Sequence, residues 1–353
     1  MPTAKRIGLG FNETLGATIL PSRCIGCGSC VATCPASCIE YIDGKPSLRG
    51  ECRSCGICSK ICPRYELPLS TLEELALGRK RGPNEPFGVY RSLWVARSMD
   101  DRILRVCQDG GVVTSLLNFA LKKGIIDGAA LSGVDENEPL RAVPRLALTE
   151  NNLVQCAGTR YNYSPNILAF GEGLERGKER LAFVGTPCQI QAIRRIQHLP
   201  LRRFSDHLSL TIGLFCSACF TYDGLVKDFI SGKMGIDPSS IKKLNIKGQL
   251  IITMKSGDVK TVPLKEIRKY TARCVEGCSD FSAELADVSV GGLGLEDWTM
   301  TILRTEFGER VFMEAKANGI IEAKPLDEVD GKILDLLIRM SVRKREASVL
   351  TRA

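Results

Sequence analysis

The sequence predicts two structured parts in one chain: a small N-terminal α+β domain built around cysteines, and a larger domain of mixed α/β fold. Eight of the sixteen cysteines form two matching runs near the N-terminus. Beyond these runs, apolar β-prone segments alternate with segments whose apolar residues recur at helical spacing, which is typical of a buried sheet covered by helices. The 353 residues are enough for one small module and one large domain. We expect a small domain, a linker, a large domain and a C-terminal helix at 1–66, 67–88, 89–326 and 327–353.

The two cysteine runs both follow the spacing C-x2-C-x2-C-x3-C-P, as CIGCGSCVATCP from Cys24 and CRSCGICSKICP from Cys52. Three closely spaced thiolates can bind one face of an iron–sulfur cube, and the fourth, followed by proline, reaches the neighbouring cube. This pattern predicts a bacterial-type two-cluster ferredoxin domain. The expected ligands of the first 4Fe-4S cluster are Cys24, Cys27, Cys30 and Cys62. Those of the second are Cys52, Cys55, Cys58 and Cys34.

Other residues of the small domain fit this interpretation. Gly26, Gly28 and Gly56 allow tight turns that bring backbone N–H groups toward the sulfurs. A zinc site would more often show two C-x2-C pairs separated by a longer loop. Cys38 lies outside the pattern, and we interpret it as a small buried hydrophobe. The segment SCIEYIDGKPSL after the first run is typical of strands.

The composition is that of a globular protein, with 44% hydrophobic and 25% charged residues. No apolar run is long enough to span a bilayer, and the N-terminal MPTAKRIGLGFNETLGA lacks the apolar core of a secretory signal. We therefore expect a cytoplasmic protein. In that compartment disulfides are rare, so the cysteines stay reduced unless they bind metal or do redox work.

The net charge of +8 is concentrated in one stretch. Residues 227–273 hold eleven Lys or Arg and four Asp or Glu, which gives 11 − 4 = +7. Such a stretch can meet nucleic acid, an acidic protein or a small polyanion, or it can be a solvated hairpin. Stacking aromatics are sparse in it (Phe229 and Tyr270), which argues against single-stranded nucleic acid.

The rest of the chain gives local predictions of helices and strands. A connector at 64–90 holds one short helix at 70–78 and then the breaker-rich RKRGPNEPFG. We expect strands at 92–98, 127–133, 145–149, 180–185 and 210–216. We expect helices at 111–124, 187–198 and 222–232. The segment 241–264 alternates like antiparallel strands with a turn near Ser256 and Gly257, and 327–346 predicts one long amphipathic helix.

Two predicted strand-to-helix junctions have the composition of phosphate sites. One is Asp109, Gly110 and Gly111; the other is Gly185, Thr186 and Pro187. Free N–H groups at a helix start can bind phosphate or a flavin ring edge where glycine permits close approach. Such junctions are more often simple turns. Neither the G-x-G-x-x-G fingerprint nor the G-x-x-x-x-G-K phosphate loop occurs.

Five later cysteines suggest a third metal site. Spacing alone favours the pairs Cys216 with Cys219 and Cys274 with Cys278, while Cys188 stands near a helix start. The chain has only two histidines, so a zinc site of mixed ligands is disfavoured and an iron–sulfur cluster fits better. Cys107 and Cys156 stand alone, and we interpret them as packing residues.

Together these residues carry a family likeness over 87–319. The segments FGVYRSLWVARSMDDRILRVCQDGGVVTSLLNFALKKGIIDGAALSG, AGTRYNYSP, FVGTPCQIQAI, IGLFC and CSDFSAELADVSVGGLG resemble, in this order, the beta subunits of F420-reducing hydrogenase and F420-dependent formate dehydrogenase. With a two-cluster ferredoxin domain ahead of it, the chain is most similar to the input subunit of the archaeal reduced-F420 dehydrogenase complexes of methanogenesis. The electron-input half of F420-dependent sulfite reductase is similar too.

The resemblance implies that the large domain binds FAD and exchanges a hydride with coenzyme F420, a deazaflavin with an anionic tail. It also implies a 4Fe-4S cluster beside the flavin, and it selects Cys188 in place of Cys219. The implied ligands of this third cluster are Cys188, Cys216, Cys274 and Cys278. We place the candidate FAD contacts at Asp109, Gly110, Gly111, Thr114, Gly158, Thr159, Arg160, Tyr161, Gly185, Thr186 and Pro187. No catalytic acid or base is predicted, because hydride transfer requires none.

The implied partners are subunits of a larger redox complex of membrane dehydrogenase, hydrogenase, formate dehydrogenase or heterodisulfide-reductase type. Such partners would hold the chain at the inner face of a membrane without a transmembrane segment of its own. Nucleic acid is not an expected partner. Two other functions remain open: a flavin and iron–sulfur subunit acting on another substrate, such as sulfite or a tetrapyrrole, and a pure electron adaptor.

Overall fold

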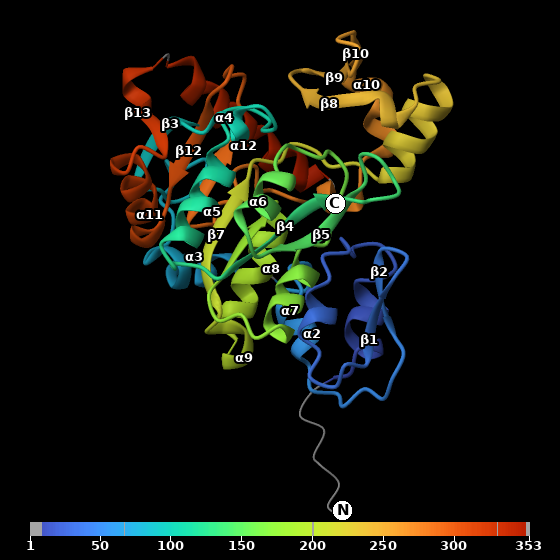
Figure 1. Cartoon of the computed structure of the whole chain (residues 1–353). Coiled ribbons are helices and arrows are strands. Elements are labelled where there is room, and N and C mark those ends of the chain that lie inside the picture. The colour runs from blue at the N-terminus through green and yellow to red at the C-terminus, as the bar shows by residue number, and fades with distance from the viewer. Residues whose placement is uncertain (1–8, 67, 200, 330, 351–353) are drawn as a thin grey trace, which may run out of the picture.

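The computed structural model describes residues 9–66, 68–199, 201–329 and 331–350. They form a small N-terminal domain, a large sheet domain and a three-stranded lobe that stands apart from the large sheet (Figure 1). The ends of the predicted ranges, 1–8 and 351–353, lie outside the described residues. None of the helices in the described part of the chain combines the length and hydropathy needed to cross a bilayer.

The small domain is a structural repeat, as the sequence predicted. Helices α1 (Ser29–Ala32) and α2 (Ile57–Ile61) occupy equivalent places in the two cysteine runs, and each follows a glycine in the left-handed region, at φ 79° and 70°. The segment after the first run forms the antiparallel hairpin of β1 (Ile39–Ile42) and β2 (Lys45–Leu48). A π-helical turn, η1 (Asn12–Gly16), packs on the same core. The strands predicted for the segment SCIEYIDGKPSL are confirmed by β1 and β2.

An eight-stranded mixed sheet forms the large domain, in the order β13-β3-β12-β11-β7-β6-β4-β5. Its strands are β3 (Ser92–Ser98), β4 (Gly128–Val134), β5 (Ala142–Ala147), β6 (Leu181–Gly185), β7 (Leu208–Leu214), β11 (Val288–Gly291), β12 (Thr299–Leu303) and β13 (Ile321–Pro325). Strands β4, β6, β7 and β11 are parallel neighbours. Strand β12 is antiparallel to both β11 and β3, so β3 runs in the same direction as these four strands. These five strands therefore end at one edge, which we call the carboxyl edge.

Helices cover both faces of this sheet. One face carries α5 (Val112–Lys122), α6 (Glu150–Gln155) and α11 (Glu306–Ala317). The other carries α7 (Ile167–Glu175) and α8 (Pro187–His198), which also contact the small domain and the connector helix α3 (Leu69–Leu77). Short helices α4 (Asp101–Leu104) and α9 (Arg202–Ser205) complete the layers.

The lobe contains most of the basic stretch and has its own core, formed by Phe229, Ile230, Leu250 and Ile252 among others. Its sheet has the order β10-β9-β8, and all its pairs are antiparallel. Its elements are η2 (Asp223–Lys233, a π-helix), η3 (Pro238–Ser240), β8 (Ile241–Ile246), β9 (Gln249–Met254), β10 (Val259–Pro263), α10 (Leu264–Ile267) and η4 (Arg268–Tyr270). A further turn, η5 (Arg273–Val275), leads back to the sheet domain.

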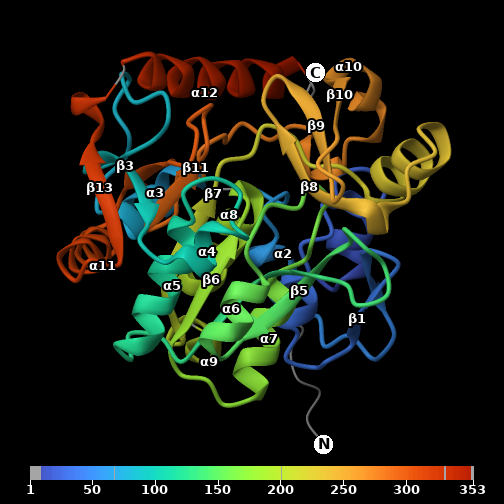
Figure 2. The ribbon, with the colours of Figure 1, turned by 45° about the horizontal axis from the view of Figure 1, so that its top comes forward.

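The last helix, α12 (Lys332–Leu350), lies along the top of the molecule and ends near the lobe (Figure 2). Its first half packs through Ile333 and Leu337 on the core that contains Val95 and Met300. The helix predicted at 327–346 is shifted in the structure: the turn η6 (Leu326–Glu328) precedes α12, which begins at Lys332.

Most local predictions in the large domain are confirmed, with limited corrections. The predicted helix at 187–198 coincides with α8, and the strand at 92–98 with β3. The predicted strand at 145–149 was wrong at its end, because β5 stops at Ala147 and Thr149 caps α6. The predicted helix at 222–232 forms with π-helical pairing. Strands β11, β12 and β13 were not predicted; β11 and β12 are short buried runs without alternation.

Candidate functional site

The two predicted strand-to-helix junctions lie at the carboxyl edge of the sheet. Gly185 is the last residue of β6, and Pro187 is the first of α8. The 109–111 loop lies beside the start of β12, where the amide of Gly110 donates to Thr299 Oγ1 at 3.0 Å. Open α/β sheets bind ligands outside the carboxyl ends of their strands, so this edge is where a cofactor is expected.

The eight cysteines of the small domain line two pockets in the pairing that the sequence predicted. We call the pocket lined by Cys24, Cys27, Cys30 and Cys62 the inner cysteine pocket. We call the pocket lined by Cys34, Cys52, Cys55 and Cys58 the outer cysteine pocket. Cys38 is buried, as expected, but it also lines the outer pocket, and its Sγ lies 3.4 Å from that of Cys34.

Both pockets have features that fit an iron–sulfur cube. The amide of Gly26 donates to Cys24 Sγ at 3.4 Å, and that of Phe11 donates to Cys52 Sγ at 3.5 Å. Such N–H···S contacts stabilise cluster ligands. Burial raises the pKa of Cys27 to about 12 and that of Cys58 to about 11. Burial therefore favours the neutral thiol at Cys27 and Cys58, and cluster binding would release protons from them.

The turn before each pocket shows why the two runs differ in sequence. A Cβ at Gly26 would lie 2.5 Å from the carbonyl oxygen of Gly44, so glycine is required there. The equivalent residue of the second run, Ser54, also has a left-handed backbone, at φ 51°. Among the described residues, no group of three or more His, Cys, Asp or Glu is arranged to hold a single metal ion.

The five later cysteines gather in the sheet domain, and we call them the core cysteine group: Cys188, Cys216, Cys219, Cys274 and Cys278. Cys188 opens α8, and its Sγ lies 3.3 Å from Thr186 Oγ1. Its interaction with the Cys274 thiol, together with burial, raises the pKa of Cys188 well above its ordinary value. Cys274 interacts with Cys188 and Cys219 alike. The structure thus brings together both the set favoured by spacing and the set implied by the resemblance.

Two arginines that the sequence analysis did not single out join the core cysteine group to the inner pocket. Arg64 lines the inner pocket and donates to the carbonyl oxygens of Cys274 at 2.9 Å and Glu276 at 2.8 Å. Arg195, on the same helix as Cys188, donates to the carbonyl oxygens of Lys60, Cys62 and Tyr65. Each arginine reaches from one domain into the backbone that carries the cysteines of the other.

Tyr163 lies between these two groups of cysteines. Its ring packs against the core that contains Cys27, Cys188 and Cys274. Its hydroxyl is buried and has no hydrogen-bond partner in the part of the chain that the structure describes. Burial, then the nearby charges of Cys188, Cys27 and Cys274, raises the pKa of Tyr163 well above its ordinary value. An unpaired buried hydroxyl is costly, which points to an acceptor bound at this place.

The 109–111 loop faces the lobe. Lys243 on β8 donates to the carbonyl oxygen of Gln108 at 2.6 Å, and the Gln108 side chain donates to the carbonyl oxygen of Leu244 at 3.2 Å. Burial raises the pKa of Asp109, although Lys243 and Lys247 oppose this effect. Where the 109–111 loop contacts the lobe, one carboxylate therefore lies near two lysines.

Other predicted flavin contacts already have partners in the protein. Arg160 donates to the carbonyl oxygens of Ser132, Cys156, Ala157 and Gly158. The Tyr161 hydroxyl lies 3.2 Å from Asn245 Oδ1 and accepts from the amide of Ile246, so it holds β8 in place. Gly158 and Thr159 are exposed, and Thr114 is buried within α5.

The glycines of the two junctions are required by packing. A Cβ at Gly110 would lie 2.5 Å from the carbonyl oxygen of Ala96, and one at Gly111 would lie 2.8 Å from Ile103 Cγ2. A Cβ at Gly185 would lie 2.7 Å from the ring of Phe183. Packing alone explains these glycines, so they do not by themselves indicate a ligand. The case for a ligand rests on the location of the junctions at the carboxyl edge.

The basic stretch is not one continuous face. Lys227 pairs with Glu138 and Asp223, and Lys233 pairs with Glu266. By contrast, Lys243 and Lys247 act on Asp109 at the carboxyl edge. Of these four lysines, the two that lie near the site are Lys243 on β8 and Lys247 in the turn between β8 and β9.

Comparison with known proteins gives matches along most of the chain. A family model described as coenzyme F420 hydrogenase/dehydrogenase, beta subunit N-term, matches residues 93–170, and the one for its C terminus matches 178–329. A 4Fe-4S binding domain matches residues 17–40.

Two relatives and one solved structure show how far the similarity extends. Coenzyme F420 hydrogenase subunit beta of Methanothermobacter thermautotrophicus is 39% identical over 73% of this chain and 92% of its own length. A subunit of the F(420)H(2) dehydrogenase of Methanosarcina mazei is 34% identical over 65% of each chain. A chain of the F420-reducing NiFe hydrogenase complex from Methanosarcina barkeri superposes with a TM-score of 0.73. It has 33% identity and covers 77% of this chain and 94% of that one.

Proposed function

The chain belongs to the coenzyme F420 hydrogenase/dehydrogenase beta-subunit family, and we propose that it is the F420-dependent oxidoreductase subunit of a larger redox complex. In this proposal the chain binds FAD at the carboxyl edge and three 4Fe-4S clusters at its cysteines. F420 is the substrate. When bound, flavin accepts or donates a hydride and exchanges single electrons with iron–sulfur clusters, so it can stand between the two kinds of carrier.

The single observation that carries the proposal is that the three cysteine groups lie next to one another in a row. Helix α8 has Cys188 of the core cysteine group at its start and Arg195, which binds the carbonyl oxygen of Cys62, two turns later. Arg64 makes the reciprocal link, and Tyr163 lies between the two groups. The core cysteine group therefore adjoins the inner pocket, and the outer pocket lies beyond it.

This placement supports a proposed order for the three clusters. Small-domain contacts with the sheet domain are made by α1 with α7 and by α2 with α8. Gly28, which lines the inner pocket, packs so closely on Leu168 of α7 that a Cβ would lie 2.8 Å from that side chain. The outer pocket is lined instead by Phe11, Arg53 and Ile57 beside its cysteines. We assign the inner cluster to exchange with the flavin side and the outer cluster to exchange with the partner subunit.

The protein's own task at the substrate site is to align two ring systems and to exclude water. We place F420 between the carboxyl edge and the lobe, where Lys243 and Lys247 supply positive charge for its anionic tail. Attachment to the inner face of a membrane would occur through partner subunits.

An anaerobic assay tests this function directly. Purified protein with its cofactors should reduce an artificial electron acceptor with reduced F420, and flavin and iron analysis should give one FAD and about twelve irons per chain. Bound flavin with turnover of sulfite or a tetrapyrrole, but not F420, would assign another substrate. A protein with full iron content but neither flavin nor F420 turnover would be a pure electron adaptor.

A further inference from the structure

Lys344, on the last turns of α12, is a buried cation that forms no ion pair within the described part of the chain. Its side chain is only 8% exposed, and Nζ donates to the carbonyl oxygen of Cys216. No carboxylate of the described residues forms an ion pair with it. Isolated buried ammonium groups are strongly disfavoured, and they are ordinarily paired or neutralised. The described residues therefore leave the buried ammonium of Lys344 without a directly paired anion.

The groups around Lys344 show where such an anion would lie. Three of them belong to the core cysteine group: Cys216, Cys278 and Cys188. The fourth is Asp280, a buried carboxyl group that forms no ion pair with Lys344 among the described residues. Thiols are neutral when protonated, whereas four thiolates around an iron–sulfur cube give the cluster a net negative charge.

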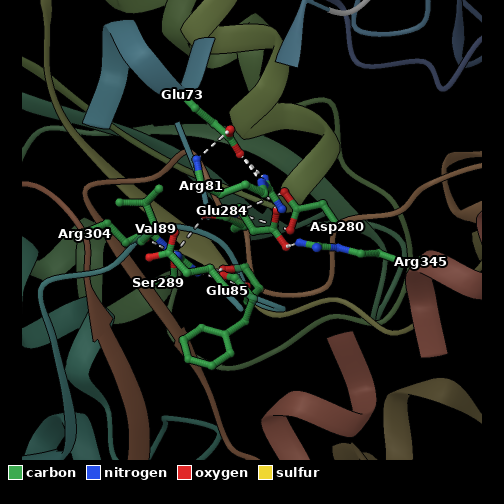
Figure 3. Close-up of polar contacts among 12 residues, drawn as sticks. Glu73, Arg81, Glu85, Val89, Asp280, Glu284, Ser289, Arg304 and Arg345 are labelled. Atoms are coloured by element: carbon green, nitrogen blue, oxygen red, sulfur yellow. Dashed lines mark hydrogen bonds and ion pairs between the residues drawn. The ribbon is translucent and has the colours of Figure 1, made fainter. Parts of the chain in front are cut away.

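The neighbouring residue shows that Lys344 is not needed to anchor the helix. Arg345 pairs with Glu284, which also pairs with Arg81 of the connector, and Arg81 pairs with Glu73 on α3 (Figure 3). The guanidinium of Arg304, near the same network, donates to the carbonyl oxygen of Val89 at 2.7 Å. This network already fixes α12 to the connector and to the sheet domain, so the unpaired charge of Lys344 calls for another explanation.

We propose that Lys344 is the charge-compensating residue of the third cluster, and that it raises the reduction potential of that cluster. The inference rests on the proposed function, because it requires a cluster at the core cysteine group. One-electron reduction adds a negative charge to the cluster, and a cation held nearby in a water-poor site stabilises the reduced form. The C-terminal helix thereby sets the potential at the junction between the flavin and the ferredoxin clusters.

Two variants separate the charge of Lys344 from its hydrogen bond. Lys344→Gln keeps an N–H donor for the carbonyl oxygen of Cys216 but removes the charge, while Lys344→Met removes both. Arg343→Gln is the matched control, since it removes an exposed positive charge from the adjacent position of the same helix. The measurement is a redox titration of each holoprotein, followed by electron paramagnetic resonance, beside iron analysis.

Both Lys344 variants should retain about twelve irons. Their third cluster should become at least tenfold harder to reduce at a fixed potential, which is a negative shift of about 59 mV or more for a one-electron couple. The control should not shift it. An unchanged potential in both variants, with all three clusters present, would overturn the inference and leave the proposed function intact. Only eight irons in the parent protein would overturn both.

A second readout does not depend on the cluster signal. In cluster-free protein, the buried ammonium of Lys344 has no ion-pair partner among the described residues, so Lys344→Met should raise the unfolding midpoint relative to the cluster-free parent. In the loaded protein the same change should not stabilise. If the cluster-free variant is less stable than its parent, Lys344 is a packing residue and the inference fails.

Discussion

The guanidinium Nη1 of Arg195 lies 2.7 Å from the carbonyl oxygen of Cys62, and this contact joins the sheet domain to the fourth cysteine of the inner pocket. Arg195→Met should leave this oxygen and those of Lys60 and Tyr65 without their donor. We expect a loss of about 1–3 kcal/mol in unfolding free energy, since buried acceptors become unsatisfied. Stopped-flow reduction of the ferredoxin clusters by reduced F420 should also slow. Arg202→Gln, an exposed change just after α8, should alter neither quantity.

Cys188 and Cys219 give opposite expectations for iron content. Cys188→Ala should lower the iron from about twelve atoms to about eight, because the third cluster loses a ligand. Cys219→Ala should keep all twelve. The reverse result would assign Cys219 as the ligand, as spacing alone favoured, and would turn Cys188 into a packing residue.

Tyr163→Phe removes a buried hydroxyl that has no acceptor among the described residues. If the hydroxyl donates to a cluster sulfur, its loss should shift the potential of the inner or the third cluster to a more negative value. The cluster-free variant should be at least as stable as its parent, because an unsatisfied group has been removed. Tyr41→Phe is the comparison, since its hydroxyl already donates to the carbonyl oxygen of Gly26 at 2.7 Å. A potential unchanged in Tyr163→Phe would mean that the hydroxyl donates to neither cluster.

Lys247→Gln should raise the KM for F420 and leave kcat nearly unchanged, because Lys247 is an exposed cation that acts on Asp109 at the carboxyl edge. It should also flatten the salt dependence of kcat/KM, since salt screens charges beyond about 8 Å at physiological ionic strength. Lys260→Gln, an exposed change on β10, is the control. If KM is unchanged but coupling to partner subunits is lost, this end of the lobe is a docking surface.

Asp287→Asn should destabilise the sheet domain by about 3–5 kcal/mol at neutral pH, as expected when one partner of a buried ion pair is removed. Asp287 pairs with Arg194 at 2.9 Å and also accepts from Thr211 and Thr305. Although burial opposes its charge, these contacts lower the pKa of Asp287. Its stabilisation is therefore present above the ordinary pKa and is lost as pH falls through the folded value. Denaturant unfolding at pH 7 and pH 3 should show a smaller pH effect in the variant than in the parent.

The features that could be predicted from sequence are those fixed by local chemistry. The spacing of eight cysteines predicted which of them share a pocket, because a short ligand loop constrains its own geometry. Helix α8 was predicted to the residue, since Pro187 is favoured at a first helical position and the Gln189 side chain accepts from the amide of Thr186.

The features that were missed depend on contacts distant in sequence. Lys344 stands between two arginines on an amphipathic helix, and only the packing of that helix against Cys216 shows that it is buried. Arg195 likewise looked like one of several basic residues on α8, although its partners lie more than a hundred residues earlier. Glycines 110, 111 and 185 suggested a ligand, whereas close contacts with the protein itself already explain them.

The outer cysteine pocket has one further consequence, which concerns dioxygen. Three of its four cysteines, Cys34, Cys52 and Cys55, are only partly buried, whereas Cys27, Cys30 and Cys62 of the inner pocket are buried. A cluster in the outer pocket would be the first that oxidants reach. Brief exposure to air should therefore stop electron transfer to the partner subunit before it impairs reduction of a small artificial acceptor. Oxidative damage would begin at the electron carrier nearest the partner subunit, and electron transfer at the flavin side would continue.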